Sequence, residues 1–426
     1  MRYHLQSLTT RKRFAGSDQP RAASFADLMN AIRPGLERAG ITRIANITGL
    51  DRTGVPVTLA IRPNSKTLAT ASGKGLTIDA AIASGAMEAL ELHAAEEAEL
   101  QTISGSFESL SRTVPTVDPR ELPRKAHCRF LPDVSENWTA AWDILSNEEV
   151  LVPTQAVLLR PLGRDKHAFH SMYAAPMDSN GLASGYTLAE AIASGLLEVI
   201  ERDSITCHLV AHERIGQAFR SANHLIRHFE SVSRLVDSLQ RNGFEVQVFD
   251  CSTDTGVPTF KCLIYDRTDE FFPPGGGYGS SLDPSVAMQR AILEAAQGRA
   301  VVIAGARDDV FSYDIEQASR SRRRIPTLTE NNGTSFISSQ ATDCFGEDIA
   351  LICEKLRGIG IQRIAVVALP VDFLGISVVK VIIPKLEGYK TSNYIATQRA
   401  IDFSSGQAIG SAQPVAHLHL PAGGSA

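Results

Sequence analysis

The sequence predicts a mixed α/β fold of the α+β type, in which three helix-strand-strand (α-β-β) units lie around a common centre with pseudo-threefold symmetry. Two repeats predict this arrangement. A seventeen-residue segment at positions 75–91 recurs at positions 185–201 with nine identical residues, and a degenerate third copy follows at 287–299. A helical pattern followed by two strand-like runs also occurs three times. Repeated units that pack against one another can build one site from distant parts of a chain.

Each α-β-β unit begins with a helical pattern that ends at a glycine, as expected where a helix terminates in a left-handed residue. These glycines are Gly40, Gly243 and Gly360. A β-branched or alternating run, a polar turn and a second such run follow, which predicts two strands. The paired runs occupy residues 38–63, 241–266 and 358–384.

The interleaving of the two repeats predicts a single domain over residues 1–426. Its approximate parts are 25–100 (first unit and first acidic helix), 150–300 (second unit and two acidic helices) and 301–410 (third unit). Residues 411–426 are rich in small residues and are expected to form a flexible tail.

The segments outside the repeats are less regular, above all residues 100–150. Trp138 and Trp142 are four positions apart, which predicts the buried face of a helix. The glycine-rich residues 273–279 predict a flexible turn. The arginines between positions 320 and 324 predict a solvated loop, with a surface for an anionic peptide or partner as the alternative.

The composition is that of an ordinary soluble globular protein, and it disfavours several classes. The chain has 426 residues, of which 43% are hydrophobic and 21% charged, with a formal net charge of −5. Nucleic-acid-binding proteins are usually basic, so we expect no nucleic-acid partner. The N-terminus has no apolar signal region and no run approaches a membrane span, so we expect a cytoplasmic protein without membrane contact. The six cysteines lack metal-ligand spacing and suggest reduced thiols, and base rates favour a homodimer.

Each recurring helix carries a stripe of polar residues. The spacing i, i+4 and i+7 places one serine and two glutamates on one helix face in both near-identical copies. The third copy has arginine, glutamate and glutamine at the corresponding positions. The three sets are Ser84, Glu88 and Glu91; Ser194, Glu198 and Glu201; and Arg290, Glu294 and Gln297. A single set would most often be a solvated face, but the repetition favours a shared site.

The neighbours of these glutamates are mostly Ala, Gly, Leu, Val and Ile, which indicates that the stripes face a packed interior. Buried carboxylates without cations would be protonated or would destabilise the fold. Mg²⁺ would neutralise them, and it usually completes its coordination with phosphate oxygens. Arg202, Arg290 and Arg299 supply positive charge for phosphate, and Lys74 of the sequence SGKG can bind an anion without forming a Walker A loop. The pattern therefore favours a nucleotide-phosphate site with more than one Mg²⁺.

At these residues the chain resembles the YcaO superfamily of ATP-dependent enzymes that modify peptide backbone amides. The resemblance extends over nearly the whole length and is carried by residues 41–57, 72–91, 179–203 and 290–309. It implies the YcaO-like fold around a central site for ATP and Mg²⁺. The Mg²⁺ ligands it implies are Glu88, Glu91, Glu198, Glu201 and Glu294. The nucleotide contacts it implies are Lys74, Ser84, Glu190, Ser194, Arg202, Gln297 and Arg299, and the catalytic residues are Glu201, Arg202 and Arg299.

The opening ITR…TGLDR…GVPV and the closing AGARDD look most like the YcaO subgroup that is paired with TfuA proteins. That resemblance implies thioamide formation in a ribosomally made peptide or protein, with a TfuA-like partner supplying the sulfur. The alternatives are an azoline- or amidine-forming YcaO enzyme and a non-catalytic ATP-binding scaffold.

The chain departs from the family pattern at four places. It ends in PAGGSA instead of the proline-rich tail of many azoline-forming members, which favours thioamidation. Leu92 follows Glu91 where many members have arginine, so one phosphate contact is in question. Tyr186 replaces an expected asparagine and puts a nucleotide contact in question. Residues 385–388, KLEG, replace the more usual GLE. No separate leader-peptide-binding domain is evident, so we expect a partner to recruit the substrate.

Overall fold

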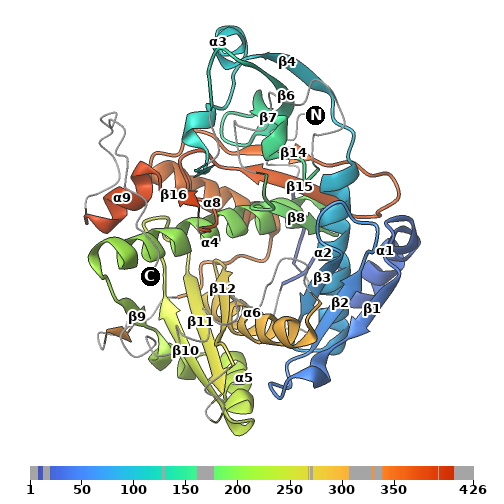
Figure 1. Ribbon diagram of the computed structural model, residues 1–426, viewed down its shortest axis with the longest axis vertical. Helices are drawn as coiled ribbons and strands as arrows, with labels where there is room; N and C mark the ends of the chain where they lie inside the picture. Colours follow the sequence, from blue (N-terminus) through green and yellow to red (C-terminus); the bar gives the residue numbers. More distant parts are fainter. Residues whose placement is uncertain are drawn as a thin grey trace.

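The computed structural model describes residues 8–12, 20–126, 130–160, 177–266, 268, 272–306, 329–330, 338–391 and 393–406. Within these residues, three mixed or antiparallel sheets each support one long helix, and the three long helices meet near the middle of the molecule (Figure 1). The prediction of a mixed α/β fold is confirmed.

The first unit runs continuously along the chain. It comprises α1 (Phe25–Arg38), β1 (Arg43–Asn46), β2 (Val57–Ile61), β3 (Thr70–Lys74) and α2 (Ile78–Glu97). The strands form an antiparallel sheet in that order, and α2 lies on β2 and β3.

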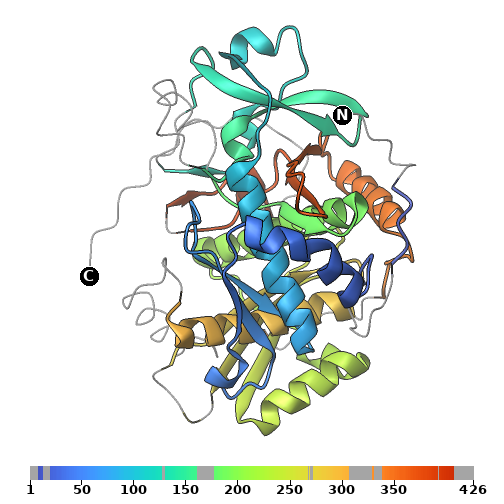
Figure 2. The ribbon, with the colours of Figure 1, turned by 90° about the vertical axis from the view of Figure 1, so that its right-hand side faces the viewer.

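The second unit repeats this order. It comprises α5 (Glu230–Arg241), β10 (Phe244–Asp250), β11 (Thr259–Asp266), β12 (Gly275–Ser280) and α6 (Pro284–Ala304). Its sheet is extended at the β10 edge by β9 (Phe219–Ser221) and β13 (Thr329–Glu330). Helix α5 lies at one end of the molecule (Figure 2).

The third unit is assembled from two parts of the chain. It combines α8 (Phe345–Gly358), β14 (Ala365–Ala368) and β15 (Ser377–Ile382) with the earlier β8 (Leu182–Gly185) and α4 (Leu188–Ile215). Strand β8 pairs with β15, and α4 lies on both. Strands β4 (Thr102–Ser106), β6 (Ser135–Asp143) and β7 (Glu148–Pro153) extend this sheet at the end opposite α5 (Figures 1 and 2).

Shorter elements complete the described chain. They are α3 (Phe107–Leu110), α9 (Gln398–Ser404), the paired strands β5 (Arg124–Lys125) and β16 (Tyr394–Ile395), and the 3₁₀ turns η2 (Thr48–Leu50), η3 (Pro119–Glu121), η4 (Thr154–Ala156) and η6 (Asn223–His228).

The three long helices begin in the same way. Thr77 and Thr187 each accept a hydrogen bond from the backbone N–H three residues later, which caps α2 and α4. Asp283 caps α6, and Pro284 occupies its first turn, where no backbone donor is needed. Each capping residue follows a strand after one or two residues. Each unit therefore consists of a strand, a tight turn and a helix that packs back over that strand.

Small residues bring these helices unusually close to their strands. A Cβ atom at Gly73 would lie 2.0 Å from the Ala81 carbonyl oxygen of α2, and one at Gly185 would lie 2.5 Å from the Ala191 nitrogen of α4. Gly275, Gly277 and Gly279 of β12 are equally close to α6. These glycines therefore allow backbone-to-backbone packing between each helix and its strand.

The contacts between the units are cyclic. Helix α2 also contacts β8, α4 also contacts β12, and α6 also contacts β3. The outer helices repeat the pattern, since α1 contacts α2, α5 contacts α6 and α8 contacts α4. Each acidic helix thus lies on its own sheet and also against a strand of another unit, namely the strand that precedes that unit's acidic helix.

The structure corrects three expectations. Trp138 and Trp142 lie on the strand β6, because residues four apart share a face in a strand as well as in a helix. Residues 273–279 do not form a flexible turn but enter β12. The expected division at residue 300 separates β8 from β15, which are hydrogen-bonded neighbours. The arginines at 320–324 and the tail at 411–426 lie outside the described residues.

Candidate active site

A cavity of about 830 Å³ lies where α2, α4 and α6 meet. Of the residues that the sequence singled out, it is lined by Lys74, Ser84, Glu88, Glu91, Glu190, Ser194, Glu198, Glu201, Arg202, Glu294 and Gln297. These side chains come from three helices and one strand that are far apart in the sequence. The structure therefore brings them together, and the roles given to them above remain predictions.

Helix α2 contributes Glu91, whose carboxylate is held by the neighbouring unit. Its Oε1 accepts hydrogen bonds from the backbone nitrogen of Ser184 at 2.8 Å and from the Ser184 hydroxyl at 2.6 Å. Burial, together with the nearby Glu88 and Glu198, raises the pKa of Glu91 to about 8, although the hydrogen bonds from Ser184 lower it. In the absence of cations this carboxyl is therefore largely protonated at neutral pH.

Helix α4 contributes an acidic pair and an arginine. Burial raises the pKa of Glu198 and raises that of Glu201 to about 7, while Arg202 lowers both. Arg202 Nη1 lies 3.5 Å from Glu201 Oε1. Burial alone would lower the pKa of Arg202, but Glu201, Glu294 and Glu198 raise it above its ordinary value. Arg202 is therefore a permanent cation among three carboxylates.

Helix α6 contributes Glu294 and Gln297, which bind Lys74 of β3. Lys74 Nζ lies 3.4 Å from Glu294 Oε2 and 3.0 Å from Gln297 Oε1. The Gln297 amide in turn donates to the Ser72 carbonyl oxygen at 2.7 Å and to the Ser72 hydroxyl at 2.9 Å. Lys74 thus partly neutralises the acidic wall from the β3 side.

The N-terminal turn of α4 forms another part of the wall. The Glu190 carboxylate accepts a hydrogen bond from the backbone nitrogen of Tyr186 at 2.9 Å and lies 3.8 Å from the Arg21 guanidinium. Arg21 lines the cavity but was missed by the sequence reasoning, because it precedes α1 and lies outside every repeat. Arg290 also lines the cavity, and its Nη1 donates to the Ser280 carbonyl oxygen at 3.2 Å.

Arg299, for which the resemblance implied a nucleotide contact and a catalytic role, does not belong to the cavity lining. Its Nε lies 2.9 Å from Asp51 Oδ2, and its guanidinium lies 4.8 Å from the Phe244 ring centroid and 4.6 Å from that of Phe272. Arg299 lies five positions after Glu294, which is roughly 140° around a helix. Arg299 therefore joins α6 to the first unit on the side away from the cavity.

The donor set suits a divalent cation bound together with phosphate. Within the described part of the chain, no group of three or more His, Cys, Asp and Glu side chains could hold a metal ion by itself. Mg²⁺ commonly takes one or two carboxylates and completes its octahedron with water and substrate phosphate, so it does not require such a group. Burial, and to a smaller extent the neighbouring carboxylates, raises the pKa of Glu91 and of Glu201. A bound cation would stabilise the ionised forms of these side chains.

Comparison with known families matches residues 72–387 to the YcaO family, described as YcaO cyclodehydratase with ATP and Mg²⁺ binding. The chain belongs to the YcaO family. The predicted resemblance and the predicted cofactors of the family, ATP and Mg²⁺, are confirmed.

Two curated relatives resemble the chain over most of its length. One is an uncharacterized protein in the tfuA 3′ region of Rhizobium leguminosarum bv. trifolii, 35% identical over 88% of this chain and 90% of its own. The other is an uncharacterized protein of Methanothermobacter thermautotrophicus, 32% identical over 86% of this chain and 95% of its own.

Solved structures share the fold. YcaO from Methanopyrus kandleri bound with AMPPCP and Mg²⁺ has a TM-score of 0.68 at 24% identity, covering 90% of this chain and 99% of that one. A heterocyclase in complex with substrate and cofactor has a TM-score of 0.72 at 19% identity, covering 90% of this chain and 55% of that one. Among the described residues, no helix is long and apolar enough to cross a membrane.

Proposed function

We propose that this protein uses ATP and Mg²⁺ to activate a backbone amide of a ribosomally made peptide or protein for thioamide formation. A TfuA-like protein would supply the sulfur as partner. The convergence of carboxylates from α2, α4 and α6 on one cavity is the observation that carries the proposal. The family supports the use of ATP, and the relative from a tfuA 3′ region supports a TfuA-like partner.

The proposed reaction exchanges oxygen for sulfur at a peptide carbonyl carbon. The amide oxygen attacks the γ-phosphate of ATP and ADP leaves. Hydrosulfide, or its equivalent delivered by the partner, adds to the same carbon, and the C–O bond breaks to release phosphate. The products are the thioamide, ADP and inorganic phosphate. Phosphoryl transfer of this kind requires mainly positioning and charge neutralisation.

The residues divide by charge in this proposal. Mg²⁺ would neutralise and orient the triphosphate and would be held by Glu88, Glu91, Glu198, Glu201 and Glu294. Lys74, Ser84, Glu190, Ser194, Arg202 and Gln297 would bind the nucleotide. Arg202 would also stabilise charge on the transferred phosphoryl group, and Glu201 would hold Arg202 in place. Arg290 adds a cation to the same wall.

Replacing Glu198 by glutamine tests the site. We expect Glu198→Gln to lose nearly all peptide-dependent ATP hydrolysis, because the amide keeps the shape of the side chain but not its charge. Glu97→Gln is the matched control, since Glu97 is at the exposed end of α2 and pairs with Lys66 at the surface. Unchanged hydrolysis in Glu198→Gln would overturn the proposed site. ATP binding without turnover in the wild type would favour a non-catalytic scaffold.

Product mass tests the reaction. Incubation with a TfuA-like protein, hydrosulfide and a candidate peptide should raise the peptide mass by about 16 Da for each thioamide. Azoline formation is the second candidate, favoured by the family description as cyclodehydratase and by the fold shared with a heterocyclase. It would lower the peptide mass by about 18 Da and would require an internal Cys, Ser or Thr nucleophile.

A further inference from the structure

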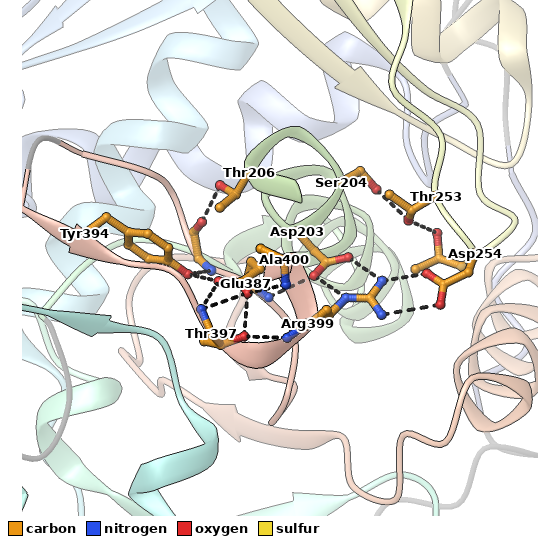
Figure 3. Close-up of polar contacts among 12 residues, drawn as sticks. Asp203, Ser204, Thr206, Thr253, Asp254, Glu387, Tyr394, Thr397, Arg399 and Ala400 are labelled. Carbon is orange, nitrogen blue, oxygen red and sulfur yellow. Dashed lines mark hydrogen bonds and ion pairs between the residues drawn. The ribbon is translucent and has the colours of Figure 1, made fainter. Parts of the chain in front are cut away.

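A buried polar network lies immediately beyond the acidic stripe of α4 (Figure 3). Asp203, which follows Arg202, is fully buried and accepts two hydrogen bonds from Arg399 of α9, at 2.6 Å from Nε and 2.7 Å from Nη2. Arg399 also donates to Asp254 at 2.7 Å. Removing one partner of such a buried ion pair leaves the other partner's charge uncompensated in the interior. The two residues therefore fix α9 against α4.

The same network fixes the segment at residues 386–390. The backbone nitrogen of Glu387 donates to Asp203 Oδ1 at 2.8 Å. The next residue, Gly388, accepts a hydrogen bond from the Thr206 hydroxyl at 2.7 Å and donates one to the Tyr394 hydroxyl oxygen at 2.8 Å. The fully buried Glu387 carboxylate accepts further hydrogen bonds from Thr397, Tyr394 and the Ala400 nitrogen, at 3.0 Å for the last (Figure 3). Backbone and side chain are thus both anchored.

The residue after this anchored pair is Tyr389, which meets Arg202. The Arg202 guanidinium lies 5.0 Å from the Tyr389 ring centroid and 5.9 Å from that of Tyr278. Arg202 lines the cavity, whereas Tyr389 is 47% exposed and lies outside the cavity lining. Tyr389 therefore contacts the arginine from outside the cavity lining.

We propose that Tyr389 is a positioning residue that holds the Arg202 side chain toward the cavity. Asp203, Glu387 and Arg399 form the anchor that places Tyr389. The proposal rests on the proposed function only in that Arg202 binds the triphosphate. An aromatic face attracts a guanidinium, and a fixed ring restricts its rotamers before the nucleotide arrives.

A double-mutant cycle tests the proposal. The affinity for AMPPCP with Mg²⁺ is measured by calorimetry for the wild type, Tyr389→Leu, Arg202→Gln and the double variant, together with kcat and KM for ATP. We expect Tyr389→Leu to weaken binding about three- to tenfold, the range of a partly desolvated cation–π contact. In the Arg202→Gln background the same change should have no further effect. Tyr389→Phe keeps the ring and should restore the affinity.

The controls separate positioning from folding. Lys390→Gln changes the next residue, which pairs with Glu213 at 2.7 Å, and should leave the affinity unchanged. Arg399→Met should lower the melting temperature and weaken AMPPCP binding in the same direction as Tyr389→Leu; if it does not fold, the Tyr389 variants decide. The positioning role is overturned if Tyr389→Leu weakens AMPPCP binding equally in the wild-type and the Arg202→Gln backgrounds. It is also overturned if Tyr389→Leu lowers the melting temperature without weakening AMPPCP binding. Wild-type affinity in Arg202→Gln would instead overturn the nucleotide contact in the proposed function.

Discussion

The close contact between β12 and α6 leads to a strong prediction for Gly277→Ala. A Cβ atom at Gly277 would lie 2.3 Å from the Ala291 carbonyl oxygen and 2.3 Å from the Ala295 nitrogen. Ordinary van der Waals contacts begin at 3.4 Å, so the added methyl group would lie about 1 Å too close to two backbone atoms. Neither atom can rotate away, and α6 must therefore move off its strand.

The expected cost is at the upper end for an overpacked core, about 3 kcal/mol of the free energy of unfolding. The shift also displaces Glu294, whose carbonyl carbon would lie 2.8 Å from the new methyl group. A misplacement of about 1 Å at a binding site costs up to about 100-fold, so we expect AMPPCP with Mg²⁺ to bind at least tenfold more weakly.

Gly276→Ala is the matched control for Gly277→Ala. A Cβ atom at Gly276 would meet only the Leu263 side chain, at 3.9 Å, so we expect a change in unfolding free energy below about 0.5 kcal/mol. Urea denaturation measures both variants, and calorimetry measures their affinity for AMPPCP. Equal denaturation midpoints for the two alanine variants would refute the argument from backbone contact.

Two further predictions concern other buried groups. His208 packs against Phe219 and Phe403, and burial lowers its pKa to about 4, below its ordinary value of 6.5. The folded protein therefore loses stability as the pH falls below about 6.5. His208→Phe should remove about 2 kcal/mol of the stability lost between pH 7.5 and pH 5, measured by urea denaturation at both values, and an unchanged pH dependence would contradict this. Ser184→Ala removes the 2.6 Å hydrogen bond to Glu91 and should cost about 1 kcal/mol of unfolding free energy. A urea denaturation midpoint equal to that of the wild type would show that the hydrogen bond from the backbone N–H of residue 184 is sufficient to hold Glu91.

Much of the fold could be predicted because the repeats carry local sequence signals for helix caps, helix ends and polar helix faces. Thr77 and Thr187 cap their helices, glycines end the outer helices, and the spacing of Glu88 and Glu91 fixes their common face. Local signals of this kind do not depend on distant parts of the chain, so the periodicity of the sequence was sufficient to identify the three acidic helices.

Long-range pairing could not be predicted in the same way. Nothing in residues 182–185 shows that this strand pairs with β15, nearly 200 positions later, because pairing is decided by the packed sheet. Spacing alone could not separate strand from helix at Trp138 and Trp142, since both periods bring positions i and i+4 to one face. The helical angle places Arg299 on a different face of α6 from Glu294 and Gln297.

The Tyr389 contact left no local signal either. Its position follows from hydrogen bonds that Asp203 and Arg399 make across almost 200 residues. The sequence KLEG at residues 385–388 marked the segment as unusual, but it did not indicate which residues the segment contacts.

Each of the helices α2, α4 and α6 contacts a strand of another unit, so the cavity is formed by the three units together. Excising one repeat would remove both a wall and the strand on which its neighbour rests. Copying one unit would therefore not by itself copy the cavity, because each wall depends on a strand of another unit.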